Sequence, residues 1–151
     1  MTAIAYIRSL GRSDGGPRDD VMTAIQAAAL WSGLLIIWIT ALGVRVTLDR
    51  RRHKVLLGDG GVADLNVSVR VFANAAEYAP LGLAALILMA LCDAPVWAIH
   101  AVGVALLTGR VIHPFGMKAT GGVRLPRALG MILTWLPLLA AGAALVILAF
   151  R

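Results

Sequence analysis

The sequence predicts an all-α, polytopic membrane protein built as a bundle of four transmembrane helices. Hydrophobic residues make up 60% of the 151 positions and charged residues only 15%, whereas an average soluble domain carries roughly a quarter charged residues. The hydrophobic residues also gather into long runs that lack charge. No segment shows the period-two alternation over ~10 residues that is typical of a membrane β-barrel. These observations favour helices over strands.

The first and fourth helices follow directly from uncharged runs. Residues 21–44 contain no Asp, Glu, Lys, Arg or His over 24 positions, and residues 128–150 contain none over 23. About 20 consecutive apolar residues cross the hydrocarbon of a bilayer as an α-helix. Each run is therefore long enough to span the membrane by itself.

Single polar side chains interrupt the two middle helices. Residues 71–91 are broken only by Glu77, and residues 94–109 only by His100. Each can cross the hydrocarbon, which needs ~17–25 residues, if its ends use interfacial positions. The predicted helices cover approximately residues 21–48, 65–91, 95–117 and 126–150.

Residues 21–151 form one predicted domain, which follows a tail of residues 1–20. The apolar part of the tail is short, and no small-residue cleavage site of a signal peptide follows it before a charged, glycine-rich patch. We therefore expect a mobile or surface-lying tail, with a tag or a targeting role as the alternative. The single cysteine, Cys92, excludes an internal disulfide. Three dispersed histidines with one cysteine do not form a metal site, so we predict no bound metal.

Basic residues predict which side of the membrane each loop faces. The loop of residues 45–70 holds six Lys or Arg and that of residues 110–127 holds four, whereas the turn at residues 92–95 holds none. Loops rich in Lys and Arg stay in the cytoplasm, so we place both long loops there and both termini on the non-cytoplasmic side. Anionic lipid headgroups account for the net charge of +6, and no nucleic-acid partner is expected.

The second helix carries a polar stripe inside its apolar run. Arg70, Asn74, Glu77 and Tyr78 stand at i, i+4, i+7 and i+8, so they share one face of a 3.6-residue helix. Glu77 lies about 10 Å deeper along the helix axis than Arg70, because each residue rises ~1.5 Å. Ionisable groups at such depth are costly, and they face the bundle interior or a wet cavity.

Two interpretations of this stripe are compatible with the residues. In the first, the stripe is a structural network in which Glu77 neutralises Arg110 of the third helix and Asn74 forms hydrogen bonds between helices. In the second, it lines a cleft, open to the cytoplasmic side, that binds a small polar or zwitterionic ligand.

The third helix and the segment after it add further polar groups. Arg110, His113 and Met117 stand at i, i+3 and i+7 and form a second stripe. His100, in contrast, is expected to lie in the core or to form a hydrogen bond between helices. Pro126 suits an early position of the fourth helix, which fixes how the neighbouring arginines are presented.

These segments resemble those of one known family. RVFANAAEYAP (residues 70–80), GRVIHPFGM (109–117) and VRLPRALG (123–130) are similar to motifs of the MAPEG proteins, the membrane-associated proteins in eicosanoid and glutathione metabolism. The segment from LGDGG to the fourth helix looks most like the family's small bacterial inner-membrane branch. The resemblance covers about residues 25–150.

The resemblance implies a homotrimer in the bacterial inner membrane. It also implies glutathione, as co-substrate, in clefts between neighbouring subunits near the cytoplasmic surface. Where the leukotriene C4 synthase branch has tyrosines on the third helix, this chain has His113 and Met117, and Met117 cannot donate a hydrogen bond. The residues that the resemblance places at glutathione are Arg50, Arg70, Asn74, Glu77, Tyr78, Arg110 and His113.

The chemistry of glutathione suits these side chains. Arginines match its two carboxylates, and Glu77 matches its ammonium. The resemblance puts Arg124 at the thiolate-stabilising position, with Arg51 of a neighbouring subunit as the second catalytic candidate. The thiol, with a pKa of roughly 8.5, would then attack a lipophilic electrophile or a lipid hydroperoxide from the bilayer as thiolate. The competing class is a non-catalytic bundle that binds lipid or a small thiol.

Overall fold

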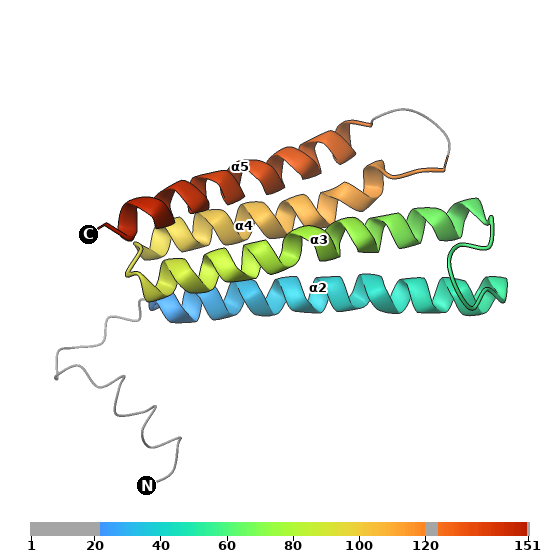
Figure 1. Ribbon diagram of the computed structural model, residues 1–151, viewed down its shortest axis with the longest axis horizontal. Coiled ribbons are helices and arrows are strands. Elements are labelled where there is room, and N and C mark those ends of the chain that lie inside the picture. The colour runs from blue at the N-terminus through green and yellow to red at the C-terminus, as the bar shows by residue number, and fades with distance from the viewer. Residues whose placement is uncertain (1–21, 120–123, 151) are drawn as a thin grey trace, which may run out of the picture.

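A computed structural model describes residues 22–119 and 124–150 as four antiparallel helices that run side by side (Figure 1). Each of the four, with α4 and η1 taken together, is long and apolar enough to cross a membrane. The described residues contain no strand, so the predicted all-α fold is confirmed. In chain order the elements are α2 (Ala24–His53), α3 (Ala63–Leu91), α4 (Val96–Ile112), the 3-10 helix η1 (His113–Gly116) and α5 (Leu125–Leu148).

Local sequence signals set both ends of α2. The Thr23 hydroxyl accepts a hydrogen bond from the Gln26 amide, and the Gln26 side chain accepts one from the Thr23 amide, which together form a capping box. At the other end, Lys54 adopts the left-handed conformation that closes many helices. The last turn holds Arg50, Arg51, Arg52 and His53, whose positive charge suits the negative end of the helix dipole.

α2 is longer than the range predicted from the sequence, which ended at residue 48. Its 30 residues rise about 45 Å, whereas the hydrocarbon core of a bilayer is ~30 Å thick. The basic last turn therefore continues the helix beyond the hydrocarbon instead of starting a loop.

The turn between α2 and α3 is built around Asp59. Its carboxylate accepts hydrogen bonds from the side-chain amide of Asn66 and from the backbone amide of Gly61. These hydrogen bonds lower the pKa of Asp59 below its ordinary value, with the Asn66 contact as the largest cause. Gly58, Gly60 and Gly61 all have positive φ angles, which explains the glycine-rich composition of this turn.

α2 ends, α3 begins, η1 ends and α5 begins at one end of the bundle, and the short turn before α4 lies at the other end (Figure 1). α2 begins, and α5 ends, at the end that holds the short turn. The arrangement brings the basic segments at the C-terminal end of α2 and the N-terminal end of α5 to the same end of the molecule. The side of the membrane that this end faces stays a prediction.

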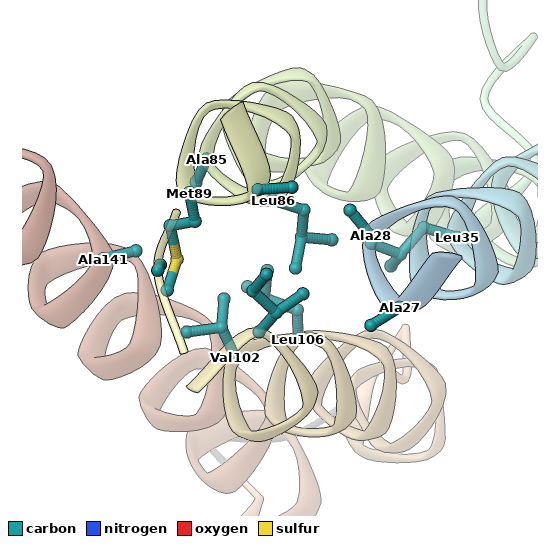
Figure 2. Packing of buried hydrophobic residues seen from close by; sticks show 12 residues of the cluster. Ala27, Ala28, Leu35, Ala85, Leu86, Met89, Val102, Leu106 and Ala141 are labelled. Atoms are coloured by element: carbon teal, nitrogen blue, oxygen red, sulfur yellow. The ribbon is translucent and has the colours of Figure 1, made fainter. Parts of the chain in front are cut away.

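A small apolar core fills the half of the bundle near the short turn. Figure 2 shows side chains from α2, α3 and α4 pointing toward a common centre, with Ala141 of α5 at its edge. Many core residues are alanines, which lets the helices approach closely. The largest fully buried side chains of this core are Leu35, Leu86, Met89 and Ile99.

Glycines bring α4 and α5 together at the other end of the core. A Cβ on Gly109 would lie 2.9 Å from the carbonyl oxygen of Gly130, and a Cβ on Gly130 would lie 2.7 Å from the Cβ of His113. Both separations are too short for ordinary contacts, so neither position accepts a side chain without movement of the helices. We call this close contact between Gly109 and Gly130 the glycine seam, and the candidate functional residues of α4 meet α5 there.

The seam predicts unequal effects of two alanine substitutions on α5. Gly130→Ala should lower the free energy of unfolding by about 1–3 kcal/mol, because the new methyl group overpacks against α4. Gly142→Ala is the matched control, since a Cβ there meets nothing within 4 Å. Thermal unfolding in detergent measures both, and equal midpoints would contradict the close approach.

Candidate functional site

Arg110 of α4 is buried in the bundle, with 2% of its surface exposed. One terminal nitrogen, Nη1, donates to Oδ1 of Asn74 on α3 at 2.8 Å. The other, Nη2, donates to the Thr134 hydroxyl and, at 3.3 Å, to the carbonyl oxygen of Gly130, both on α5. The guanidinium therefore joins three helices through hydrogen bonds of its side chain.

Two aromatic residues complete the surroundings of Arg110. The indole nitrogen of Trp38 on α2 donates to the Arg110 backbone carbonyl at 3.1 Å. The guanidinium carbon lies 5.5 Å from the ring centroid of Tyr78, within cation–π range. We call Trp38, Asn74, Tyr78, Arg110, Gly130 and Thr134 the Arg110 hub, and its members come from all four helices.

The structure does not form the Glu77–Arg110 ion pair of the first interpretation of the stripe, because Arg110 donates to Asn74 and Thr134 instead. Glu77 is exposed, and the one ion pair among the described residues is formed by Arg45 and Asp49, 3.8 Å apart. The reason is helix geometry. Successive residues turn by 100°, so Tyr78 and Asn74 lie at the edge of the stripe that faces α4, and Glu77 lies at the other edge.

Arg110 is therefore a buried cation whose hydrogen-bond acceptors are neutral. An amide oxygen, a hydroxyl and a backbone carbonyl accept from its terminal nitrogens. Its Nε has no partner among the described residues. Burying a charge in a membrane bundle is costly, so each of these acceptors contributes to keeping the guanidinium in place. The predicted hydrogen bonds of Asn74 between helices are confirmed.

The outer edge of the polar stripe points away from the bundle. Arg70 and Glu77 are both exposed, although both lie within α3. Asn74 is half-buried between this edge and the hub. The stripe that the sequence predicts thus divides into an inner part, fixed by Arg110, and an outer part that is free on a single chain.

The second predicted stripe, on α4 and η1, turns inward. His113 is buried, with its Cβ against Gly130 of α5. Met117 packs against the apolar cluster of Leu42, Val71 and Ala75 between α2 and α3. All three residues of this stripe, Arg110, His113 and Met117, therefore make contacts within one chain, and none of them is exposed.

The remaining predicted residues lie at the end of the bundle where α2 ends and α5 begins. Arg50 and Arg51 are in the last turn of α2, where Arg50 is half-buried and Arg51 is exposed. Arg124 is the N-cap residue of α5 and is exposed. Pro126 occupies the first turn of α5, as predicted. Topology therefore brings these arginines to the same end as Arg70, without a contact between them among the described residues.

Two hub residues, Trp38 and Thr134, were not predicted from the sequence. Each lies in an uncharged apolar run, where a tryptophan or threonine looks like ordinary lipid-facing or core composition. Thr134 is fully buried and also donates to the Gly130 carbonyl at 2.8 Å. A hydroxyl in such a run indicates a polar contact only when a buried hydrogen-bond donor is known to face it.

A second polar contact lies in the other half of the bundle. The indole nitrogen of Trp31 donates to Nδ1 of His100 at 2.9 Å, so the predicted hydrogen bond of His100 between helices is confirmed. Gly103 makes room for the Trp31 ring, because a Cβ there would lie 2.1 Å from the ring. Within residues 22–119 and 124–150, no three His, Cys, Asp or Glu side chains gather to hold a metal ion.

Fold and site together define a polytopic four-helix membrane protein with a buried arginine hub and a polar stripe on its second span. The sequence pattern of the MAPEG family matches residues 28–147, and the chain belongs to that family. The inner membrane protein YecN of Escherichia coli strain K12 is 31% identical over 114 residues, which cover 76% of this chain and 86% of the relative. YecN of Escherichia coli O6:H1 strain CFT073 matches to the same extent.

The family and the bacterial branch predicted from the motifs are thereby confirmed. The relatives are named as inner membrane proteins, and four apolar helices fit a multi-pass protein of that membrane.

The hub makes a testable prediction about Thr134. Thr134→Val keeps the side-chain shape but leaves Arg110 without one acceptor, so the free energy of unfolding should fall by about 1–3 kcal/mol. Thr134→Ser keeps the hydroxyl and should lose much less. Thr108→Val, at an exposed threonine of α4, is the control. Denaturant unfolding followed by tryptophan fluorescence measures all three, and a neutral Thr134→Val would contradict the hub.

Proposed function

We propose that this protein is a glutathione-binding enzyme of the bacterial inner membrane, with both termini on the non-cytoplasmic side. It acts as a glutathione transferase or peroxidase on lipophilic electrophiles or lipid hydroperoxides. Glutathione is the co-substrate, and the sites lie in clefts between the subunits of a homotrimer. The observation that carries the proposal is the exposure of Glu77 within a membrane-spanning helix.

An exposed carboxylate at this depth requires a polar neighbour. Facing lipid, an ionised glutamate is costly, and such residues normally face a bundle interior or a wet cavity. Within one chain Arg110 does not serve as that neighbour, because its guanidinium is held by Asn74 and Thr134. A second subunit over this face of α3 would cover Glu77 and enclose a polar cleft. Family membership supports this assembly.

The outer part of the stripe matches glutathione group by group. Arg70 is an exposed guanidinium, suited to a carboxylate by two parallel hydrogen bonds. Glu77 is suited to the ammonium group. Asn74 and Tyr78, half-buried at the edge of the hub, form the wall between the ligand and Arg110. In this proposal Arg110 and His113 support the wall from inside the bundle, and Arg50 adds positive charge at the cytoplasmic end.

The chemistry centres on the thiol of glutathione. Arg124, at the N-cap of α5, stabilises the thiolate, and Arg51 of a neighbouring subunit is the second candidate. In conjugation the thiolate sulfur forms a bond to the electrophilic carbon, and the leaving group departs with the bonding electron pair. With a hydroperoxide, the thiolate sulfur forms a bond to the outer oxygen as the O–O bond breaks, which gives the sulfenic acid of glutathione, and the alkoxide takes a proton to become an alcohol. The thiol of a second glutathione then attacks the sulfenic sulfur, which releases water and forms glutathione disulfide.

A non-catalytic bundle that binds lipid or a small thiol is the second candidate. The burial of His113 and the apolar packing of Met117 favour it, since neither residue offers a hydrogen bond to a ligand on the surface of the chain. The two candidates differ in turnover and not in fold.

The binding half of the proposal is tested at Glu77. Millimolar glutathione should raise the thermal midpoint of the detergent-purified protein, because a ligand that binds only the folded state stabilises it. Glu77→Gln should weaken glutathione binding roughly tenfold or more, since it removes one charge-assisted hydrogen bond. Asp64→Asn, at another exposed carboxylate of α3, should bind as the parent does. Absence of any shift in the parent would remove glutathione from the proposal.

The catalytic half is tested at Arg124. Conjugation of a chromogenic aryl halide should fall about tenfold in Arg124→Ala at neutral pH, because one unit of thiol pKa corresponds to ~1.4 kcal/mol. The deficit should shrink as the pH rises above the thiol pKa, where thiolate forms unaided. Arg127→Ala, at an exposed arginine in the first turn of α5, is the matched control. Full activity in Arg124→Ala with loss in Arg51→Ala would transfer the role to Arg51.

A further inference from the structure

Two tryptophans of α2 donate hydrogen bonds to α4. Within residues 22–119 and 124–150, the indole nitrogens of Trp31 and Trp38 form the two hydrogen bonds that join these helices. The tryptophans are seven positions apart, so they share one face of α2 and lie about 10 Å from each other along its axis. Their acceptors differ in chemistry. Trp38 donates to the backbone carbonyl of Arg110, which does not titrate, whereas Trp31 donates to the imidazole of His100, which does.

Two residues of α4, one turn apart, hold the Trp31 indole. A Cβ on Gly103 would lie 2.1 Å from the ring, so the ring has room only because this residue is glycine. The indole nitrogen lies 2.9 Å from Nδ1 of His100, and the two rings meet edge to face with their centroids 6.0 Å apart. Trp31 also packs against the apolar core near the short turn. The contact is therefore specific in both position and direction.

The direction of this hydrogen bond defines the protonation state of His100. Because Nδ1 accepts, it carries no proton, and the imidazole is neutral with its proton on Nε2. A protonated imidazole carries an N–H at both nitrogens and accepts at neither. Two N–H groups would then face each other, so the hydrogen bond from Trp31 would break. An imidazole ordinarily changes its charge between about pH 5 and 8.

The helices that pack around His100 carry no charge at its level. Residues 22–44 of α2, 79–91 of α3 and 128–148 of α5 contain no Asp, Glu, Lys, Arg or His. The titratable groups at this end of the described chain are Cys92 and Asp93, both exposed in the turn before α4. His100 lies four residues into α4, about 6 Å from its first residue. A charged His100 would therefore turn toward water and Asp93 at the short turn and away from Trp31.

From this geometry we infer that His100 is a proton sensor in the half of the bundle near the short turn. Neutral His100 holds α2 against α4 through Trp31. Protonation breaks this hydrogen bond and releases the first turns of α2 from α4, while Trp38 keeps the rest of α2 in contact with α4. By the predicted topology, the sensor responds to acidity on the non-cytoplasmic side of the membrane.

This inference does not rest on the proposed glutathione activity. His100 lies ten residues before Arg110, about 15 Å away along α4, and it belongs to neither the hub nor the polar stripe of α3. Failure of the glutathione tests would leave the sensor intact, and failure of the pH test would leave the glutathione proposal intact.

The test is nuclear magnetic resonance of the full chain in detergent with isotope-labelled tryptophan, which gives a separate signal for each indole N–H. Trp31→Phe and Trp38→Phe assign the two signals. From about pH 8 to about pH 5 the Trp31 signal should shift. Its exchange with water should increase on the order of tenfold relative to that of Trp38, because the released indole has lost its acceptor. The Trp38 signal should stay in place, since its acceptor is a carbonyl.

Two asparagine substitutions separate His100 from the other histidines. His100→Asn places a carbonyl oxygen on Cγ, where Nδ1 was, so it keeps an acceptor that does not titrate. The Trp31 signal should then be constant with pH. His53→Asn is the matched control, because it removes an exposed histidine at the end of α2, far from the short turn, and it should respond to pH as the parent does.

Thermal unfolding gives a second measurement. The stability that the Trp31–His100 hydrogen bond contributes is present when the imidazole is neutral and is lost as the pH falls through its titration. Between about pH 8 and pH 5 the thermal midpoint of the parent should therefore fall by about 2–5 °C more than that of His100→Asn. Trp31→Phe, which lacks the donor, should follow His100→Asn.

Three results would overturn the inference. A Trp31 signal that stays constant over this pH range would show that His100 does not titrate in the folded protein. Equal changes at Trp31 and Trp38 would show that acid acts on the whole bundle and not on this contact. A pH response that persists in His100→Asn would assign the response to another group.

Discussion

The structure depends on the burial of one cation without a carboxylate. Arg110 lies almost fully inside a membrane bundle, where a guanidinium is stable only if its donors are satisfied. Neutral acceptors come from α3 and α5, and Trp38 of α2 holds the backbone of Arg110 itself. Because the hub needs a contribution from every helix, it fixes their relative rotation as well as their contact. The glycine seam between α4 and α5 brings the Gly130 carbonyl and Thr134 within reach.

The rotation of α3 that the hub imposes determines what its polar stripe can do. With Asn74 and Tyr78 turned toward Arg110, Arg70 and Glu77 must lie on the surface of the chain. The inner edge of the stripe therefore forms the structural network, and the outer edge is the part that can line a ligand cleft. The hub performs the structural task with neutral partners, which leaves the carboxylate free for a ligand. In the proposed cleft the two tasks are linked, since any change in the hub would also turn Glu77.

The fold was predictable because it follows from uncharged runs long enough to cross a bilayer. The polar stripe was also visible, since a glutamate within such a run is unusual. Pairing within the stripe was not predictable. The sequence places Glu77 and Arg110 in neighbouring spans, but helix rotation decides which of Asn74 and Glu77 faces the arginine, and close packing at Gly109 and Gly130 sets that rotation. The role of Thr134 was missed for the same reason, because a threonine in an apolar helix can be recognised as an acceptor only when the donor opposite it is known.

A cryo-electron microscopy structure of the protein in lipid nanodiscs with glutathione would test the division of the polar stripe most directly. Glutathione is expected between two chains, with its ammonium at Glu77 and a carboxylate at Arg70, while Arg110 keeps its hydrogen bonds to Asn74 and Thr134. A ligand held directly by Arg110, or Glu77 facing lipid in every subunit, would contradict the division of the stripe into an inner hub and an outer binding edge.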